Sequence, residues 1–312
     1  MRIRDIITRV NIISEERGVL IESKRLYTTA FQEYILDDEM LRKMQNELFK
    51  ILLDVKYVCE KYDIKYMLNG GTLLGAIRHK GFIPWDDDID IMMKRPEVEK
   101  FVVKFREEFS DKYLVAEPLC DDKYVFKSIK IFKLGTKYVE IPYAGIDAFD
   151  MLFIDVFIFE NVPANKFIRN LRNRYYNFFY NAASVCVDYK FPSPIIEQKA
   201  KENEDVAKYL KFRRRLGCFF SHVGGMKFYL KSCERIGNMK RHTGWLGDPS
   251  GGCLVENFPE GFFDGCSTGE FCGEQFPIPK DYDLYLKTLY GDYMKLPEQS
   301  ERDCHVAYKV EF

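Results

Sequence analysis

Two aspartates spaced two residues apart have the side chains needed to bind a divalent cation. Asp88 and Asp90 alternate with isoleucine in the run Asp88-Ile89-Asp90-Ile91. In a β-strand such side chains share a face, and their Cα atoms lie about 6.5 Å apart. Carboxylates so placed repel each other unless a cation compensates them, and magnesium or manganese, which prefer oxygen ligands, suit the position. We therefore predict a metal site here, although an isolated Asp-x-Asp is more often a solvated acidic turn.

A glycine turn upstream of the aspartates favours the metal site over the solvated turn. Asn69-Gly70-Gly71-Thr72 ends a short apolar run. Glycine permits close backbone approach and leaves N–H groups available to phosphate oxygens. Gly70, Gly71 and Thr72 are therefore candidate substrate-binding residues at a site of metal-assisted phosphoryl transfer.

We expect a third carboxylate from a neighbouring strand. Asp155 interrupts the apolar run 152–158, and a buried aspartate costs free energy unless it is paired or bound to metal. Asp150 competes for the same role, and a structural aspartate at a strand end is the alternative interpretation. Asp88, Asp90 and Asp155 are thus the predicted metal-binding and catalytic residues.

Basic and aromatic residues near the aspartates are further candidates for substrate binding. Arg78, His79 and Lys80 lie between the glycine turn and the aspartates, where they could neutralise a diphosphate or stabilise a leaving nucleotide. Trp85 could stack on a base or shield a choline-type cation. Lys130, in a predicted strand, could point a cation into the same cleft. The alternatives are a solvated loop for the cations and simple loop anchoring for Trp85.

The elements around these residues form the pattern of a mixed α/β protein. Apolar residues at helical spacing predict helices, and alternating or apolar runs predict strands. The predicted helices cover about 38–61, 72–79, 96–109 and 282–294, with a charged helical region at 163–242. The predicted strands cover 64–68, 88–92, 124–132, 138–141 and 152–159. Residues 243–275 contain many glycines and few periodic runs, so we expect an irregular segment there.

Composition excludes several classes of protein. Lysine and arginine number 47 against 48 acidic residues, which disfavours a dedicated nucleic-acid binder. The nine cysteines are odd in number and never spaced as C-x-x-C, so neither a disulfide framework nor a zinc ribbon is indicated. A structural zinc held by the cysteines near the C-terminus and His305 is a minor alternative.

The expected location is the cytoplasm. The first residues are too charged for a signal peptide, and the chain contains no run of about 18 apolar residues that could span a membrane. The basic stretch 211–215, beside Phe219 and Phe220, could rest on anionic lipid at the inner face of the membrane. A solvated helix face explains the stretch equally well.

Three blocks of the sequence resemble the LicD family, phosphorylcholine transferases of bacterial cell-surface glycans with the fukutin-related proteins as distant relatives. The first is the long run 71–91, from Gly71-Thr72-Leu73-Leu74-Gly75 to Trp85-Asp86-Asp87-Asp88-Ile89-Asp90-Ile91. Ile154-Asp155-Val156-Phe157 resembles the family's second acidic strand. Tyr290-Gly291-Asp292-Tyr293-Met294, with Leu296-Pro297, resembles its C-terminal signature. The resemblance extends from about Leu41 to His305.

The resemblance implies a fold and an activity. The fold would be nucleotidyltransferase-like, a mixed sheet flanked by helices. The activity would be transfer of a phosphoryl-alcohol group from a CDP-activated donor, with CDP-choline favoured, to a hydroxyl of a cell-surface glycan, with release of CMP. The acceptor would be teichoic acid, lipopolysaccharide or a capsule precursor, which could be lipid-linked. Asp88 and Asp90 carry over as metal ligands and Asp155 as the third carboxylate.

On this basis the chain divides into three parts: an N-terminal extension (1–35), a nucleotidyltransferase-like catalytic core (36–162), and a mainly helical region (163–312) that packs on the core and recognises the acceptor. Arg302 and His305 could close over the site or belong to a frayed tail.

Two other functions fit the same acidic residues: transfer of NMP from an NTP to a small acceptor, and an inactive module that binds a glycan or a nucleotide.

Overall fold

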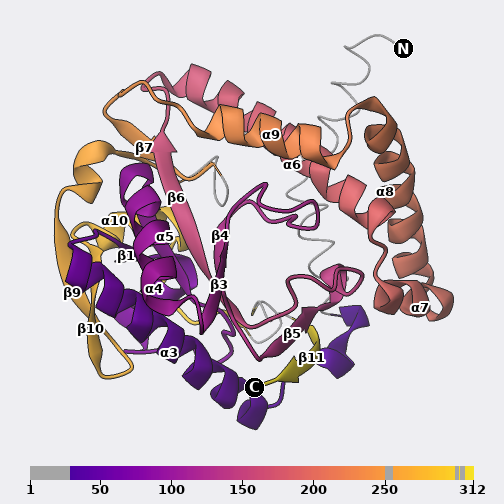
Figure 1. The fold of residues 1–312 in the computed structure, drawn as a ribbon, viewed down its shortest axis with the longest axis horizontal. Coiled ribbons are helices and arrows are strands. Elements are labelled where there is room, and N and C mark those ends of the chain that lie inside the picture. The colour runs from indigo at the N-terminus through magenta and orange to yellow at the C-terminus, as the bar shows by residue number, and fades with distance from the viewer. Residues whose placement is uncertain (1–28, 250–255, 299–301, 303–305) are drawn as a thin grey trace.

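A mixed β-sheet occupies the centre of the fold (Figure 1), which the computed structural model describes for residues 29–249, 256–298, 302 and 306–312. Its strands are β1 (Met67–Leu68), β2 (Asp90–Lys94), β3 (Tyr113–Ala116), β4 (Ile129–Lys133), β6 (Phe153–Asn161), β7 (Trp245–Gly247) and β8 (Asn257–Pro259). The main path is β1-β2-β6-β4-β3, and β7 and β8 continue from the far end of β6. Only the β2–β6 ladder within this sheet is parallel. The expected mixed α/β class is confirmed.

Two strand pairs flank the main sheet. β9 (Cys266–Phe271) and β10 (Glu274–Pro279) form an antiparallel hairpin. β11 (Ala307–Glu311) returns from the C-terminus to pair with β5 (Lys137–Glu140). The β5–β11 pair, which joins residues far apart in sequence, lies at the lower edge of the molecule in Figure 1.

Three helices of the first half surround the sheet. α3 (Asp38–Tyr62) begins where the Asp37 carboxylate accepts the N–H of Met40 at 2.8 Å, as a helix N-cap does. Its buried stripe packs against α5 (Arg95–Phe109), and both helices contact β6. α4 (Gly70–Arg78) connects β1 to the loop before β2. α10 (Tyr282–Tyr290) packs on α4 from the other end of the chain.

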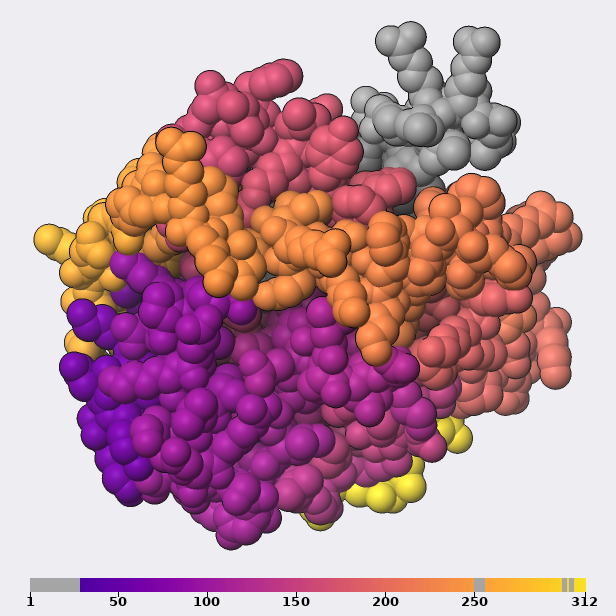
Figure 2. Space-filling model, turned by 45° about the horizontal axis from the view of Figure 1, so that its top comes forward, coloured from indigo at the N-terminus to yellow at the C-terminus, as the bar shows by residue number. Residues whose placement is uncertain are grey.

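Four helices follow β6: α6 (Lys166–Lys190), α7 (Pro194–Glu202), α8 (Glu204–Val223) and α9 (Met226–Gly237). α6 packs on α8 and α9, and α7 packs on α8. Figure 2 shows the orange segment that contains α9 as a band across the visible face, above the purple N-terminal half. Across the described ranges, no helix combines the length and the apolar character that a membrane crossing needs.

The structure corrects several predicted elements. The segment 243–275, expected to be irregular, contains β7, β8 and β9 within its described residues. The strand expected at 124–132 begins only at Ile129, and β3 was not predicted at all. The strand expected at 88–92 begins at Asp90. These strands have only three to six residues and are defined by hydrogen bonds across a ladder, and local periodicity does not record which segments pair.

A close helix crossing yields a stability prediction. A Cβ at Gly217 of α8 would collide with the carbonyl oxygen of Val185 in α6 and lie 2.7 Å from the Cβ of Tyr189. Alanine favours a helix interior over glycine by about 1 kcal/mol, but forced overpacking costs about 1–3 kcal/mol or more. We expect Gly217→Ala to lower the free energy of unfolding by about 2 kcal/mol, measured by urea denaturation. Gly261→Ala is the control, because its Cβ would meet no described heavy atom within 4 Å; equal losses in the two variants would contradict this account.

Candidate active site

The parallel pairing of β2 with β6 places two of the predicted carboxylates side by side. Asp90 opens β2, and its Cα partner across the ladder is Asp155 of β6. The N–H of Asp155 donates to the carbonyl oxygen of Ile89 at 2.9 Å. Neighbouring strands lie about 4.8 Å apart and paired residues point to the same face. Both carboxylates therefore emerge on one side of the sheet.

Asp88 joins this pair from the loop that enters β2. Burial still alternates as predicted, because Ile89 and Ile91 are fully buried while Asp88 and Asp90 are only partly so. Burial raises the pKa of the Asp90 carboxyl well above its usual value, and repulsion from Asp88, Asp155 and Asp86 raises this pKa further. The structure thus concentrates negative charge at the start of β2.

Two polar residues hold Asp155: Lys130 in the adjacent strand β4 and Ser128 just before that strand. The Cα partner of Asp155 in β4 is Lys130, whose ammonium lies 2.8 Å from Asp155 Oδ2. The Ser128 hydroxyl donates to Asp155 Oδ1 at 2.5 Å. The ammonium also lies 3.4 Å from the centroid of the Phe153 ring. Lys130 therefore lies against Asp155 and compensates part of its charge, whereas its contact with substrate stays a prediction.

Asp150, the rival for the third carboxylate, lies elsewhere. It forms an ion pair with Lys137 of β5. The strand register thus places Asp155 beside Asp90. Ser128 was not among the predicted site residues; the available signal was its spacing of two from Lys130, which puts both side chains on one face where the chain is extended.

The predicted glycine turn lies directly against the carboxylates. Gly70 has φ +48°, a conformation that favours glycine, and a Cβ there would lie 3.0 Å from Asp90 Oδ2. A Cβ at Gly71 would lie 2.8 Å from Asp86 Oδ2. The Thr72 hydroxyl accepts the N–H of Asp90 at 2.8 Å. The N-terminus of α4, which carries the positive end of the helix dipole, therefore lies beside the acidic residues.

The C-terminal helix α10 adds two tyrosines that were not among the predicted site residues. The buried Tyr285 hydroxyl lies within hydrogen-bond distance of the Asn69 side-chain oxygen and 3.2 Å from Glu256 Oε2. The Tyr290 hydroxyl lies 3.8 Å from the position of a Cβ on Gly70. Burial, with repulsion from Asp90 and Asp86, raises the pKa of Tyr290. The available signal for Tyr290 was its place in the C-terminal block that resembles the family.

Of the three basic residues between the glycine turn and the aspartates, two are partly buried. Arg78 donates to the carbonyl oxygen of Tyr293 at 2.7 Å and to His79 Nε2 at 2.9 Å. Burial and the neighbouring guanidinium lower the pKa of His79, which favours the neutral imidazole. The Lys80 side chain is exposed, and its carbonyl oxygen accepts the N–H of Cys272 in the β9–β10 turn.

The Trp85 ring contacts His79 and Arg302. The His79 ring meets it edge-on, with centroids 6.4 Å apart. The Arg302 guanidinium lies over the indole at 4.2 Å from the ring centroid, a cation–π contact. Arg302 thus approaches the site region from the C-terminal segment, whereas His305 falls outside the described residues.

The donor set at the start of β2 fits a hard divalent cation. Asp88, Asp90 and Asp155 offer only carboxylate oxygens, and a cation would relieve the repulsion that raises the pKa of Asp90. In the part of the chain that the structure describes, no three His, Cys, Asp or Glu side chains already converge on a common point. Binding would therefore require the carboxylates to turn toward the ion.

The cysteines behind the alternative zinc site lie partly outside the described residues. Cys253 and Cys304, like His305, fall there. Cys266 and Cys272 are exposed free thiols. The zinc alternative therefore stays a prediction.

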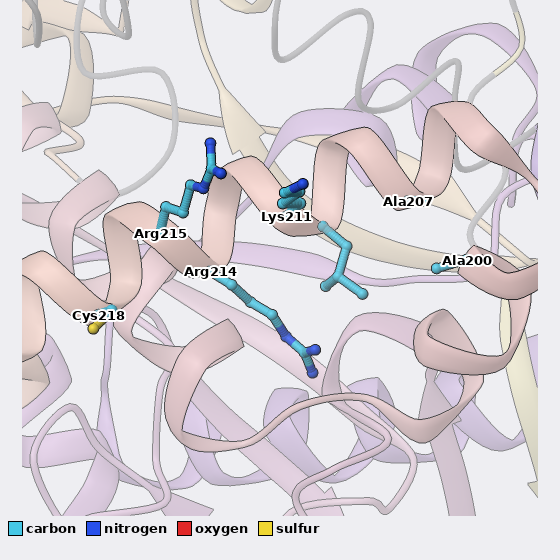
Figure 3. Close-up of a pocket in the computed structure, with 7 residues that line it drawn as sticks. Ala200, Ala207, Lys211, Arg214, Arg215 and Cys218 are labelled. Carbon is cyan, nitrogen blue, oxygen red and sulfur yellow. The ribbon is translucent and has the colours of Figure 1, made fainter.

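The basic stretch 211–215 lies on α8 and is partly engaged in the helical region. Arg213 forms an ion pair with α6, and Arg214 forms one with α7. Lys211 and Arg215 are exposed and, with Leu210, line an open pocket of about 400 Å³. Figure 3 shows that the side chains of Arg214 and Arg215 leave α8 on opposite sides of the helix. Contact of this stretch with lipid stays a prediction.

Comparison with known proteins agrees with this architecture. The family described as LicD/FKTN/FKRP, nucleotidyltransferase domain, matches residues 63–195. The chain is also 33% identical over 270 residues to the lipopolysaccharide cholinephosphotransferase LicD of Haemophilus influenzae, covering 85% of this chain and 95% of that protein. The chain belongs to the LicD family. The matched domain contains all three predicted aspartates.

Two further relatives of this LicD-family chain match shorter segments. An uncharacterized protein of Rickettsia typhi is 28% identical over 132 residues, 40% of this chain and 41% of that protein. The ribitol 5-phosphate transferase FKRP of Homo sapiens is 53% identical over 34 residues, 11% of this chain and 7% of that protein. The resemblance predicted from the three blocks is confirmed.

The contact between α10 and the glycine turn yields a second stability prediction. Tyr285→Phe removes the hydroxyl that donates to the side-chain oxygen of the buried Asn69, and loss of a hydrogen bond at a buried polar group costs about 1–3 kcal/mol. We expect the free energy of unfolding to fall by that amount in urea denaturation. Tyr282→Phe, at the start of the same helix, is the matched control because no hydrogen bond of its hydroxyl is seen among the described residues. An unchanged stability of Tyr285→Phe would show that α10 does not anchor the turn.

Proposed function

We propose that this LicD-family protein transfers a phosphoryl-alcohol group, phosphocholine in the first place, from a CDP-activated donor to a hydroxyl of a cell-surface glycan, with release of CMP. The observation that carries the proposal is the register of Asp90 with Asp155 beside a glycine turn that opens α4. The similarity to a lipopolysaccharide cholinephosphotransferase supports the choice of alcohol and acceptor.

The reaction would be an in-line displacement. The acceptor oxygen attacks the phosphorus that carries the alcohol, and the bond from that phosphorus to the oxygen of CMP breaks. Magnesium or manganese held by Asp88, Asp90 and Asp155 would supply charge neutralisation on the diphosphate.

The other side chains act by binding and orientation. Gly70 and Gly71 leave room for phosphate oxygens against the N–H groups that begin α4, because a Cβ at either position would crowd a carboxylate. Lys130 orients Asp155 and brings positive charge next to the reacting groups. Arg78 is the cation best placed to stabilise the departing nucleotide. Trp85 offers a ring face to a base or to a quaternary ammonium group.

The donor and the acceptor can be identified together. Purified protein with magnesium would be offered CDP-choline, CDP-ethanolamine, CDP-glycerol or CDP-ribitol, with and without lipopolysaccharide or teichoic acid, and CMP would be quantified by chromatography. We expect the fastest acceptor-dependent CMP release from CDP-choline and its loss after chelation with EDTA. Release of pyrophosphate from an NTP, without CMP release from any CDP-alcohol, would instead show a nucleotidyltransferase. Binding of donor with no turnover on any acceptor would point to an inactive module.

The carboxylates at the start of β2 should be needed for turnover but not for folding. Asp88→Asn and Asp90→Asn each remove charge from the proposed metal site while keeping side-chain size. We expect CMP release to fall at least about a hundred-fold, the scale of losing one electrostatic group at a reacting centre. Asp150→Asn is the matched control, because Asp150 pairs with Lys137 away from the site and should leave the rate within a few-fold. Circular dichroism would check that all three variants fold, and full activity of Asp90→Asn would refute the assignment.

A further inference from the structure

The first turns of α6 expose apolar side chains and bury polar ones. Four large apolar side chains are 46–78% exposed and, at about 100° per residue, share one stripe along the helix, called here the α6 stripe: Phe167, Ile168, Leu171 and Tyr175. The residues that the fold buries on the opposite side of these turns are Arg169, Asn173 and Tyr176. A helix on the surface of a globular protein usually turns its apolar stripe toward the core. The reversal indicates that something outside the fold covers the α6 stripe.

Polar contacts fix this orientation of α6. The Arg169 guanidinium lies over the Trp245 ring, 4.3 Å from its centroid, and donates to the carbonyl oxygen of Pro163 at 2.8 Å. Arg172 donates to the carbonyl oxygen of Gly237 at 2.9 Å. Rotating the helix to bury the α6 stripe would break these contacts and expose the polar side. The stripe therefore stays on the outside.

The surface beside the α6 stripe is basic. The chain after α9 follows the first turns of α6, from Gly237 to Thr243, whose hydroxyl donates to the carbonyl oxygen of Val162 at 2.6 Å. Figure 1 shows α6 and α9 side by side along the upper edge of the fold. Neither 162–187 nor 235–247 contains an acidic residue. The exposed cations of these two segments are Lys166, Arg174, Arg235, Lys240 and Arg241.

Three carboxylates that border these segments are engaged in ion pairs. Glu160 and Glu234 both pair with Arg95 of α5, and Asp188 pairs with Arg213 of α8. The charge exposed around the α6 stripe is therefore positive. Apolar side chains surrounded by positive charge complement a partner that is both apolar and negatively charged.

The surface of an anionic lipid bilayer has both properties. Its phosphate groups attract lysine and arginine, and its acyl boundary accepts phenylalanine, leucine and isoleucine side chains from a helix that lies in the plane of the interface. A second copy of this chain fits less well. A symmetric contact through the same patch would bring the cations of both copies face to face, where they repel.

We propose that the α6 stripe and the cations of segment 238–242 bind the surface of an anionic lipid bilayer. The stripe enters the boundary between headgroups and acyl chains, and Lys240 and Arg241 contact headgroup phosphates. This surface is distinct from the basic stretch 211–215, because Arg213 pairs with Asp188 near the far end of α6, about 30 Å along the helix from Phe167. The inference does not depend on the function proposed for the aspartates.

Vesicle binding tests the proposal directly. The purified full chain would be sedimented with sucrose-loaded vesicles of phosphatidylcholine, alone or mixed with about 30% phosphatidylglycerol. We expect at least about tenfold tighter binding to the anionic vesicles, weakening as sodium chloride is added. Asp90→Asn should bind them as the wild type does, which excludes capture of a headgroup by the transfer site. Equal binding to both kinds of vesicle, or to neither, would overturn the proposal.

Variants of the α6 stripe separate lipid contact from a structural role. Phe167→Gln combined with Leu171→Gln should weaken binding to anionic vesicles at least about tenfold. The same double variant should not lower the free energy of unfolding, because both side chains are exposed and glutamine suits a helix at least as well as phenylalanine. Val103→Gln, 52% exposed on α5, is the matched control and should keep its affinity. Intact binding together with lost stability would show that the stripe packs within the protein, contrary to the proposal.

Two further variants test the cations and the site of contact. Lys240→Gln with Arg241→Gln should weaken binding at least about tenfold, since each basic group near an anionic surface contributes about fivefold. In Phe167→Trp the new indole should be quenched by brominated lipid in anionic vesicles beyond any quenching of the wild type. Absence of that quenching would contradict insertion of the stripe. A dimer that Phe167→Gln dissociates, or binding to soluble polyglutamate but not to vesicles, would identify a second copy or an acidic protein as the occupant and refute the lipid assignment.

Discussion

The parallel ladder between β2 and β6 sets the geometry of the acidic site. It sets Asp90 opposite Asp155, which concentrates charge that a folded protein tolerates only with compensation. Lys130, opposite Asp155 on the other neighbouring strand, supplies part of it. The positive end of α4 supplies more, because Gly70 permits its first turn to lie against Asp90. The remaining repulsion favours positive charge at the start of β2, which is what the proposed metal-assisted transfer requires.

The rest of the fold holds this ladder in place. Ile89, Ile91 and Ile154 are fully buried, so the strand ends that carry the aspartates are anchored in the core. α10 closes the arrangement from more than two hundred residues away, through the hydroxyl of Tyr285 on Asn69. The glycine turn beside the aspartates thus depends on the docking of α10, a helix near the C-terminus, against Asn69.

The helices after β6 contribute differently. α6, α8 and α9 pack mainly on one another, and the close approach at Gly217 ties α6 to α8. They are joined to the rest of the fold by β7, which pairs with the last residues of β6, and by the ion pair of Glu234 in α9 with Arg95 of α5. The family match to residues 63–195 includes α6 and ends at the start of α7.

Residue types and their spacing were enough to predict the candidate site residues and most of the helices. The spacing of Asp88 and Asp90, the Gly70-Gly71 turn and the amphipathic stripe of α3 are written in residues close together, because helices and turns are stabilised by contacts a few residues apart. The folded structure was needed to show that Asp155 and not Asp150 stands beside Asp90, that Ser128 and Lys130 hold Asp155, and that α10 reaches the glycine turn. It also shows that β7 and β8 extend the sheet. Those outcomes depend on strand register and on packing between distant segments, and no local pattern specifies which partners will meet.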